Sequence, residues 1–252
     1  MISSVEKSLS KVPEVTLVFW IIKIAATTLG ETAGDAVSMS MNLGYLIGTA
    51  IFAAIFLVAV LVQIKAAKFH PVIYWTTIIA TTTVGTTMAD FADRSMGIGY
   101  AGGSSLLFIL LLASLVVWYR TLGSISVNTV SNAKAEIFYW VTIMFSQTLG
   151  TALGDWTSDS AGLGYTGSAV LFGALLALTA ALCFWTKISR TFLFWAAFIL
   201  TRPLGAVVGD FLDKPVDHGG LALSRYTASA ALLIFMIAFI FIFPHRAAQK
   251  AH

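Results

Sequence analysis

Residues 18–35 read VFWIIKIAATTLGETAGD, and variants of this stretch return at residues 73–90, 138–155 and 193–210. Each copy carries a tryptophan, a glycine ten positions later and an aspartate five positions after the glycine. Internal repetition of this kind indicates an architecture built from one repeated unit. Each unit also places one carboxylate at an equivalent position, and carboxylates within long apolar stretches indicate a shared polar site.

Composition indicates an integral membrane protein. The 252 residues are 58% hydrophobic and 11% charged, with a mean hydropathy of +0.87, whereas average chains carry about 25% charged residues. The basic residues are scattered at the ends of apolar stretches and form no patch, so no nucleic-acid partner is expected. Cys183 is the only cysteine, which excludes a disulfide framework and a cysteine metal site. The N-terminal residues carry mixed charges without a cleavage motif, so no signal peptide is expected.

Eight apolar stretches are long enough to cross a bilayer, which takes about 20 helical residues. They lie near residues 15–37, 44–65, 71–93, 99–120, 136–158, 164–186, 191–213 and 224–244. Ten lysines and arginines fall on the side of both termini, and three fall in the opposite loops: Arg94, Lys214 and Arg225. The positive-inside rule therefore places both termini in the cytoplasm. With two spans per repeat, all four repeats enter the membrane from the same side.

The repeat spacing divides the chain into two similar halves, since Trp20 and Trp140 are 120 residues apart, as are Trp75 and Trp195. The predicted organisation is a cytoplasmic segment at 1–14, a four-helix half at 15–125, a second half at 126–246 and a cytoplasmic tail at 247–252. We predict an all-α integral membrane protein with eight transmembrane helices from four parallel two-helix repeats. Its symmetry about the membrane normal is expected to be pseudo-twofold, with weaker fourfold character. The first helix of each repeat is expected to line the centre.

The tryptophans and glycines that recur in every repeat are expected to have structural roles. Each repeat tryptophan follows another aromatic residue near the start of its helix, and the four are Trp20, Trp75, Trp140 and Trp195. An interfacial aromatic belt is expected from them, with stacking on a substrate as the alternative. The repeat glycines are expected to let helices approach closely. A helix break beside each glycine, exposing backbone groups to a cavity, is the alternative.

A polar stripe precedes each repeat aspartate, because positions four and eight residues earlier lie on the same helix face. The stripes are Thr27, Glu31 and Asp35; Thr82, Thr86 and Asp90; Gln147, Thr151 and Asp155; and Arg202, Ala206 and Asp210. The first stripe extends back to Lys23. Such faces are too polar for lipid, so the four helices are expected to turn them toward one another. The alternative is a structural role, with threonines bonded to backbone and Glu31 paired with Lys23 or Arg202.

Charge and ligand chemistry suggest a cation site along these stripes. Glu31 and the four repeat aspartates outnumber Lys23 and Arg202 by three charges, which favours protonation or a bound cation. Oxygen ligands without cysteine suit magnesium, calcium or manganese. The expected metal ligands are Glu31, Asp35, Asp90, Asp155 and Asp210, with the stripe threonines and Gln147 in support. An outer access site is expected at Asp93, Asp213, Asp217 and His218.

The pattern resembles a family of bacterial membrane proteins made of four tandem copies of a two-helix repeat with a characteristic tryptophan and no known function. The resemblance rests on the four repeat tryptophans and covers nearly the whole chain. It implies the eight-helix architecture and a location in the bacterial inner membrane. It supplies no substrate and no site residues.

The leading functional hypothesis is a secondary transporter of a divalent cation, with manganese as the first candidate. Parallel halves would rock about the central site, and protons released from the carboxylates would exchange for metal. The alternatives are a cation channel, an organic-anion carrier that uses Lys23 and Arg202, and a non-transporting membrane scaffold or sensor. An enzyme is not expected, because no nucleophile with a base is evident, and neither is an organic cofactor. The expected partners are membrane lipids, the cation and protons, while homo-oligomerisation is left open.

Overall fold

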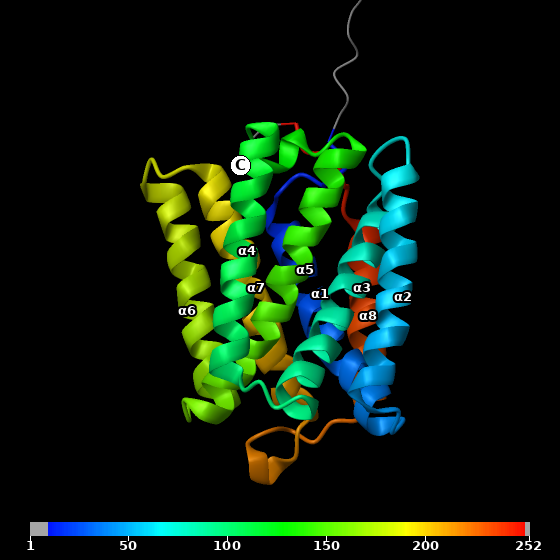
Figure 1. Ribbon diagram of the computed structural model, residues 1–252, viewed down its shortest axis with the longest axis vertical. Helices are drawn as coiled ribbons and strands as arrows, with labels where there is room; N and C mark the ends of the chain where they lie inside the picture. The colour runs from blue at the N-terminus through cyan, green and yellow to red at the C-terminus, as the bar shows by residue number, and fades with distance from the viewer. Residues whose placement is uncertain (1–9, 250–252) are drawn as a thin grey trace, which may run out of the picture.

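The computed structural model describes residues 10–249, which form an all-helical bundle (Figure 1). The first helices of the four repeats are α1 (Leu17–Asp35), α3 (Pro71–Asp90), α5 (Ala133–Asp155) and α7 (Arg190–Asp213). The second helices are α2 (Gly44–Lys65), α4 (Tyr100–Leu122), α6 (Gly164–Trp185) and α8 (Arg225–Ile242). Lys7 and Lys250, two of the basic residues expected in the cytoplasm, lie outside the described residues, as do most of 1–14 and the end of the 247–252 tail.

The odd-numbered helices form a closed ring at the centre of the bundle. Helix α1 packs against α3 and α7, and α5 packs against the same two helices. Consequently α1 faces α5 across the ring, and α3 faces α7. Each even-numbered helix packs outside the ring against the first helix of the following repeat, so that α2 lies on α3, α4 on α5, α6 on α7 and α8 on α1. The contact of α8 with α1 joins the last repeat to the first.

Burial and hydropathy separate the inner helices from the outer ones. Within the described residues, six helices are long and apolar enough to cross a membrane: α1 with its extension, α2, α4, α6, α7 and α8. Helices α3 and α5, which were also expected to span, are not among these six. Their neighbours in the ring and the outer helices cover most of their surface, so an apolar sequence is not required of them. The fold is that of a helical membrane protein.

Three odd-numbered helices continue beyond their aspartates as short π-helical segments, which extend two or three residues past the ends of the expected spans. These segments are η1 (Ala36–Ser40), η2 (Phe91–Ser95) and η4 (Trp156–Ser160). The fourth repeat differs, because α7 stays α-helical to Asp213 and Pro215 follows shortly after. Proline has no backbone N–H and cannot continue the helical hydrogen-bond pattern. The remaining short elements are the 3₁₀ turns η3 (Val127–Thr129) and η5 (Val216–His218).

The repeat glycines lie where neighbouring helices of the ring meet. A β-carbon at Gly30 would lie 2.9 Å from the Cβ atom of Thr82, and one at Gly205 would lie 2.8 Å from the backbone carbonyl carbon of Thr27. Gly85 lies similarly close to Gln147, and Gly150 lies similarly close to Arg202. The prediction of close helix approach is therefore confirmed. All four helices run unbroken past these glycines, which is against the alternative of a helix break.

An aromatic layer lies across the ring near the end that holds the termini. In each repeat, the aromatic residue before the tryptophan contacts the tryptophan of the next repeat, in the pairs Phe19 and Trp75, Tyr74 and Trp140, Tyr139 and Trp195, and Phe194 and Trp20. Ring centroids 5.4–6.1 Å apart are typical of favourable aromatic pairs. Trp75, Trp140 and Trp195 are buried. These three tryptophans therefore pack against the neighbouring repeat, and the position of the layer at a membrane interface stays a prediction.

The chain segments beside the aromatic layer are tied to one another. Lys11 forms an ion pair with Glu136 of α5, with 2.7 Å between Nζ and Oε1. The backbone N–H of Lys11 donates to the carbonyl of Val130, in the loop between the two halves of the chain. Pro13 and Ala247 form an isolated bridge that joins the two ends of the described chain. This end of the bundle is therefore closed both by aromatic packing and by polar contacts.

Candidate cation site within the helix ring

The polar stripes of the odd-numbered helices are buried inside the ring. The polar residues of the stripes each have at most 2% of their surface exposed, and they are Lys23, Thr27, Glu31, Asp35, Thr82, Thr86, Asp90, Gln147, Thr151, Asp155, Arg202 and Asp210. Polar groups are kept from lipid when they face one another in this way. The stripes therefore form a polar axis between the aromatic layer at one end and the repeat aspartates at the other.

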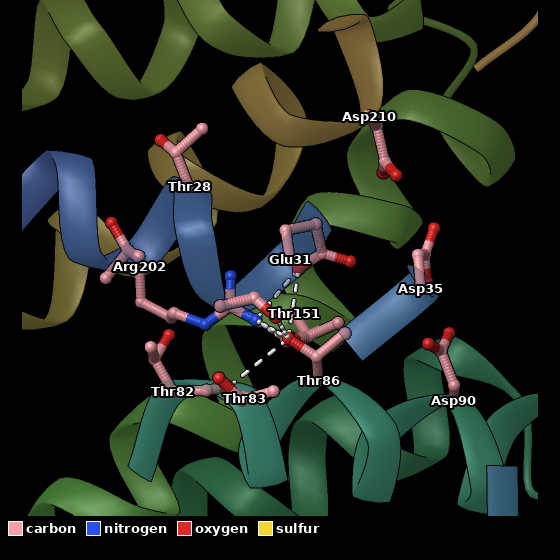
Figure 2. A network of polar contacts seen from close by, with 12 residues as sticks. Thr28, Glu31, Asp35, Thr82, Thr83, Thr86, Asp90, Thr151, Arg202 and Asp210 are labelled. Atoms are coloured by element: carbon pink, nitrogen blue, oxygen red, sulfur yellow. Dashed lines mark hydrogen bonds and ion pairs between the residues drawn. The ribbon is translucent and has the colours of Figure 1, made fainter. Parts of the chain in front are cut away.

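One guanidinium joins all four helices of the ring. Arg202 Nη2 on α7 donates hydrogen bonds to Glu31 Oε2 on α1 at 2.9 Å, to Thr86 Oγ1 on α3 at 2.6 Å and to Thr151 Oγ1 on α5. Figure 2 shows the Arg202 side chain reaching between the helices to this point. Ion-paired hydrogen bonds are the stronger ones in proteins. The suggested pairing of Glu31 with Arg202 is thus present.

Lys23 has a different environment from Arg202. Its Nζ atom lies 4.2 Å from the centroid of the Phe198 ring, as in a cation–π contact. This atom has no hydrogen-bond partner within residues 10–249. The suggested alternative pairing of Glu31 with Lys23 is not seen.

The stripe threonines have two kinds of environment. Thr27 Oγ1 donates to the carbonyl of Ile24 on its own helix at 2.8 Å and lies 3.1 Å from the carbonyl of Thr201 on α7. This arrangement matches the structural interpretation, in which a threonine bonds to backbone. Thr86 and Thr151 instead bond to Arg202. Thr82 Oγ1 and both amide atoms of Gln147 have no hydrogen-bond partner in the part of the chain that the structure describes.

Three of the five expected metal ligands gather in one place. Glu31 and Asp35 on α1 and Asp210 on α7 each offer a carboxylate oxygen, and these oxygens lie within 4.8 Å of one another. All three side chains are buried. Figure 2 shows Asp35 and Asp210 beyond Glu31, on the far side from Arg202. Oxygens at this spacing, two residues from the first repeat and one from the last, can surround a hard cation.

Asp90 and Asp155 are held separately by an arginine. Arg94 Nε lies 2.8 Å from Asp90 Oδ1, and Arg94 Nη2 lies 3.5 Å from Asp155 Oδ2. The expected five-carboxylate site is therefore divided into two groups. Arg94 accounts for the division, because its guanidinium occupies the position between these two carboxylates.

Lys214 holds the other pair of aspartates in the equivalent way. Its Nζ atom forms an ion pair with Asp35 and lies 3.1 Å from Asp210 Oδ1. Lys214 lies 120 residues after Arg94, so each of these cations joins its own repeat to the next one. Burial alone would lower the pKa of Lys214, but the carboxylates of Asp210, Asp35 and Asp213 outweigh burial and raise this pKa above its ordinary value. Lys214 is therefore charged at neutral pH.

These contacts correct the expected surplus of negative charge. Arg94 and Lys214 were counted as loop cations, yet both fold back onto the repeat aspartates, and Arg225 lies 3.7 Å from Asp35. The carboxylates are therefore largely neutralised by cations of the chain itself. One signal in the sequence points to this result, since Arg94 and Lys214 each follow an aspartate by four residues, which is the spacing of helical ion pairs. Arg225 has no aspartate four residues before it.

The four residues of the expected outer access site do not form one group. Asp213 is buried and pairs with Arg225, with 3.0 Å between Oδ2 and Nε. Asp217 and His218 are exposed in the 3₁₀ turn η5. Asp93 lies in the second repeat, where its Oδ1 atom is close to Gly103 of α4. Asp93 lies apart from the other three residues because it belongs to the second repeat and they belong to the fourth, and these repeats lie on opposite sides of the ring.

The fold and the site define a class of protein: a helical membrane protein built from repeated two-helix units around a buried polar axis. Residues 18–69, 73–124, 138–189 and 193–249 each match the family described as Repeat of Unknown Function (DUF347). The chain therefore belongs to this family, as its resemblance in sequence predicts. No curated protein and no solved structure matches the chain.

Proposed function

We propose that the protein is a secondary transporter of a divalent cation, with Mn²⁺ as the first candidate substrate. The observation that carries the proposal is the buried group of Glu31, Asp35 and Asp210, whose carboxylate oxygens lie within 4.8 Å of one another. Hard divalent cations prefer oxygen ligands of this kind. The hydroxyl of Thr86, which lies 3.3 Å from Glu31 Oε2, adds an oxygen close to the same carboxylates.

Lys214 gives this site a built-in competitor for the substrate. Its ammonium group pairs with Asp35 and Asp210, so a cation that binds these carboxylates has to displace it. Displacement is easier than removal of a rigid group, because lysine has a flexible four-carbon stem. Protonation of the carboxylates after the metal leaves would couple transport to a proton gradient.

The proposed mechanism is alternating access about the polar axis. The end that holds the termini is closed by the aromatic layer and by the ion pair of Lys11 with Glu136. Opening this end would require the pair to separate and the aromatic contacts to part. The cation channel is less well supported, because Arg202 and Lys23 place positive charge on the same axis.

The proposal includes eight membrane crossings, pseudo-twofold symmetry and an inner-membrane location with both termini in the cytoplasm. We expect a Ser160→Cys variant to react with an impermeant maleimide in intact cells, and a Lys187→Cys variant to react only after permeabilisation. Both residues are exposed, at opposite ends of α6, and Cys183 is first replaced by serine to remove the natural thiol. The positive-inside rule gives this orientation. The reverse labelling pattern would show that the orientation is inverted.

Replacing Asp35 by asparagine is expected to weaken Mn²⁺ binding more than tenfold. Asparagine keeps the shape of the side chain but removes the charge that attracts the cation, and a tenfold change corresponds to about 1.4 kcal/mol. Calorimetry on the purified protein measures the affinity. Asp159→Asn is the matched control, because Asp159 is exposed and lies outside the group of three carboxylates. Equal affinity of the wild-type protein and the Asp35→Asn variant would exclude Asp35 as a ligand.

A second candidate function is a structural one, in a membrane scaffold or sensor. The pairing of the repeat aspartates with Arg94 and Lys214 favours this possibility, because paired charges can fix helix register without binding a ligand. The same calorimetry separates the two functions. A scaffold predicts that Asp35→Asn lowers thermal stability and that neither protein binds a divalent cation.

A further inference from the structure

A group of unpaired donors lies in the middle of the ring, apart from the carboxylate group. Lys23 is completely buried, and its Nζ atom has no hydrogen-bond partner among residues 10–249. The Phe198 ring, 4.2 Å away on α7, offers a cation–π contact but accepts no conventional hydrogen bond. Buried ammonium groups are normally paired. Lys23 therefore lacks the hydrogen-bond acceptor that a buried amino group normally has.

Three further residues of the ring have buried polar atoms without a hydrogen-bond partner in the described chain. Arg202 uses Nη2 for its bonds to Glu31 and the two threonines, whereas its Nε and Nη1 atoms have no partner within the described chain. The amide of Gln147 and the hydroxyl of Thr82 are also buried without partners there. Thr82, Gln147 and Arg202 occupy equivalent positions in their repeats, three residues before the glycine. The unpaired groups therefore come from α1, α3, α5 and α7 at neighbouring depths.

The local charge favours an anion at this depth. With Lys23 protonated, Lys23 and Arg202 contribute two positive charges, and Glu31 supplies one negative charge that is already paired with Arg202. The repeat aspartates lie one turn beyond Glu31, about 6 Å further along the axis, and have cations of their own in Arg94 and Lys214. A single negative charge would balance Lys23.

The close packing of the ring limits the size of the ligand. A β-carbon at Gly150 would lie 2.5 Å from the Cβ atom of Arg202, and one at Gly85 would lie 3.0 Å from the Cβ atom of Gln147. The helices therefore meet tightly at the depth of the unpaired donors. These close contacts are compatible with a halide or nitrate ion and not with a large organic anion.

We propose that the centre of the ring binds a small, singly charged inorganic anion between Lys23 and Arg202, with Gln147 and Thr82 as neutral donors. The anion accepts hydrogen bonds from Lys23 Nζ, from the free guanidinium N–H groups, from Gln147 Nε2 and from Thr82 Oγ1. Charge-assisted hydrogen bonds of this kind are short and strong. This site is separate from the proposed cation site and does not depend on it.

The test is chloride binding by the purified protein in detergent, starting from gluconate buffer. Gluconate keeps the ionic strength constant and is too large for the site. We expect chloride to raise the melting temperature of the wild-type protein in a saturable way, because a ligand of the folded state stabilises it. Lys23→Met should raise the apparent Kd for chloride more than tenfold. Lys187→Met is the control, because Lys187 is exposed, and it should leave the Kd unchanged.

If the Lys23→Met protein does not fold, a substitution that leaves the charge of the site unchanged still tests the proposal. Gln147→Leu removes a donor without altering charge and should raise the Kd at least threefold. Asp35→Asn should leave chloride binding intact, so failure of the cation proposal is distinguishable from failure of this one. Absence of saturable chloride binding by the wild-type protein would overturn the proposal. An unchanged Kd in both the Lys23→Met and Gln147→Leu proteins would overturn it equally.

Discussion

Replacing Arg202 by methionine should destabilise the protein by about 3–5 kcal/mol, the range found when one partner of a buried ion pair is removed. Arg202 Nη2 is the group that joins Glu31, Thr86 and Thr151 across the ring. Methionine of similar length leaves the Glu31 carboxylate buried without its partner. Thermal unfolding in detergent, followed by tryptophan fluorescence, measures the loss.

A double variant separates the ion pair from the packing of the arginine side chain. Adding Glu31→Gln to Arg202→Met removes the orphaned charge, so the double variant should recover much of the stability that the single variant loses. Replacement of both members of a buried pair by neutral groups is often well tolerated. A double-mutant cycle gives the coupling between the two residues. Additive losses from the two single changes would contradict a direct Arg202–Glu31 interaction.

Gly205→Ala should destabilise the protein by about 3 kcal/mol, at the upper end of the range for overpacking a tight interface. The added β-carbon would lie 2.8 Å from the backbone carbonyl carbon of Thr27 and would push α7 away from α1. Because α1 and α7 belong to the first and last repeats, the substitution opens the ring at its closing contact. The melting temperature measures this effect.

Gly173→Ala is the control for the intrinsic effect of alanine in a helix. Apart from its chain neighbours and the nearby backbone of α6 itself, no atom of the described residues lies within 4 Å of a β-carbon at Gly173. Alanine there should be neutral or stabilising by up to about 1 kcal/mol, because glycine is the poorer helix former. Equal melting temperatures of the Gly205→Ala and Gly173→Ala proteins would show that the ring tolerates separation at this contact.

The ring of helices follows from sequence because its determinants repeat. The spacing of tryptophan, glycine and aspartate gives each repeat the same helix, and the residues four and eight positions before each aspartate identify the face that has to be buried. Gly30 and Gly205 then lie at the helix contacts in the structure. The order of packing is less evident, because α2 lies on α3 and α8 on α1, and sequence alone does not say which neighbour an outer helix covers.

The charge pairing of the site was the main feature that sequence reasoning missed. Arg94 and Lys214 were assigned to loops from the sequence, whereas both side chains reach back to aspartates one turn earlier. Their bonds to the aspartate of the next repeat depend on the order of helices around the ring. The packing of Trp75 against Phe19 of the preceding repeat depends on the same order. Contacts between repeats were therefore less predictable than features within one.

The measurement that tests the proposed function most directly is Mn²⁺ flux into proteoliposomes, with and without a pH gradient. The wild-type protein and the Asp159→Asn variant should carry Mn²⁺ at similar rates. An opposing proton gradient should change both rates. The Asp35→Asn variant should show no Mn²⁺ flux above that of empty vesicles. The folded wild-type protein is predicted to give saturable uptake. Absence of flux for Mn²⁺, Mg²⁺ and Ca²⁺ with either direction of the pH gradient would contradict divalent cation transport.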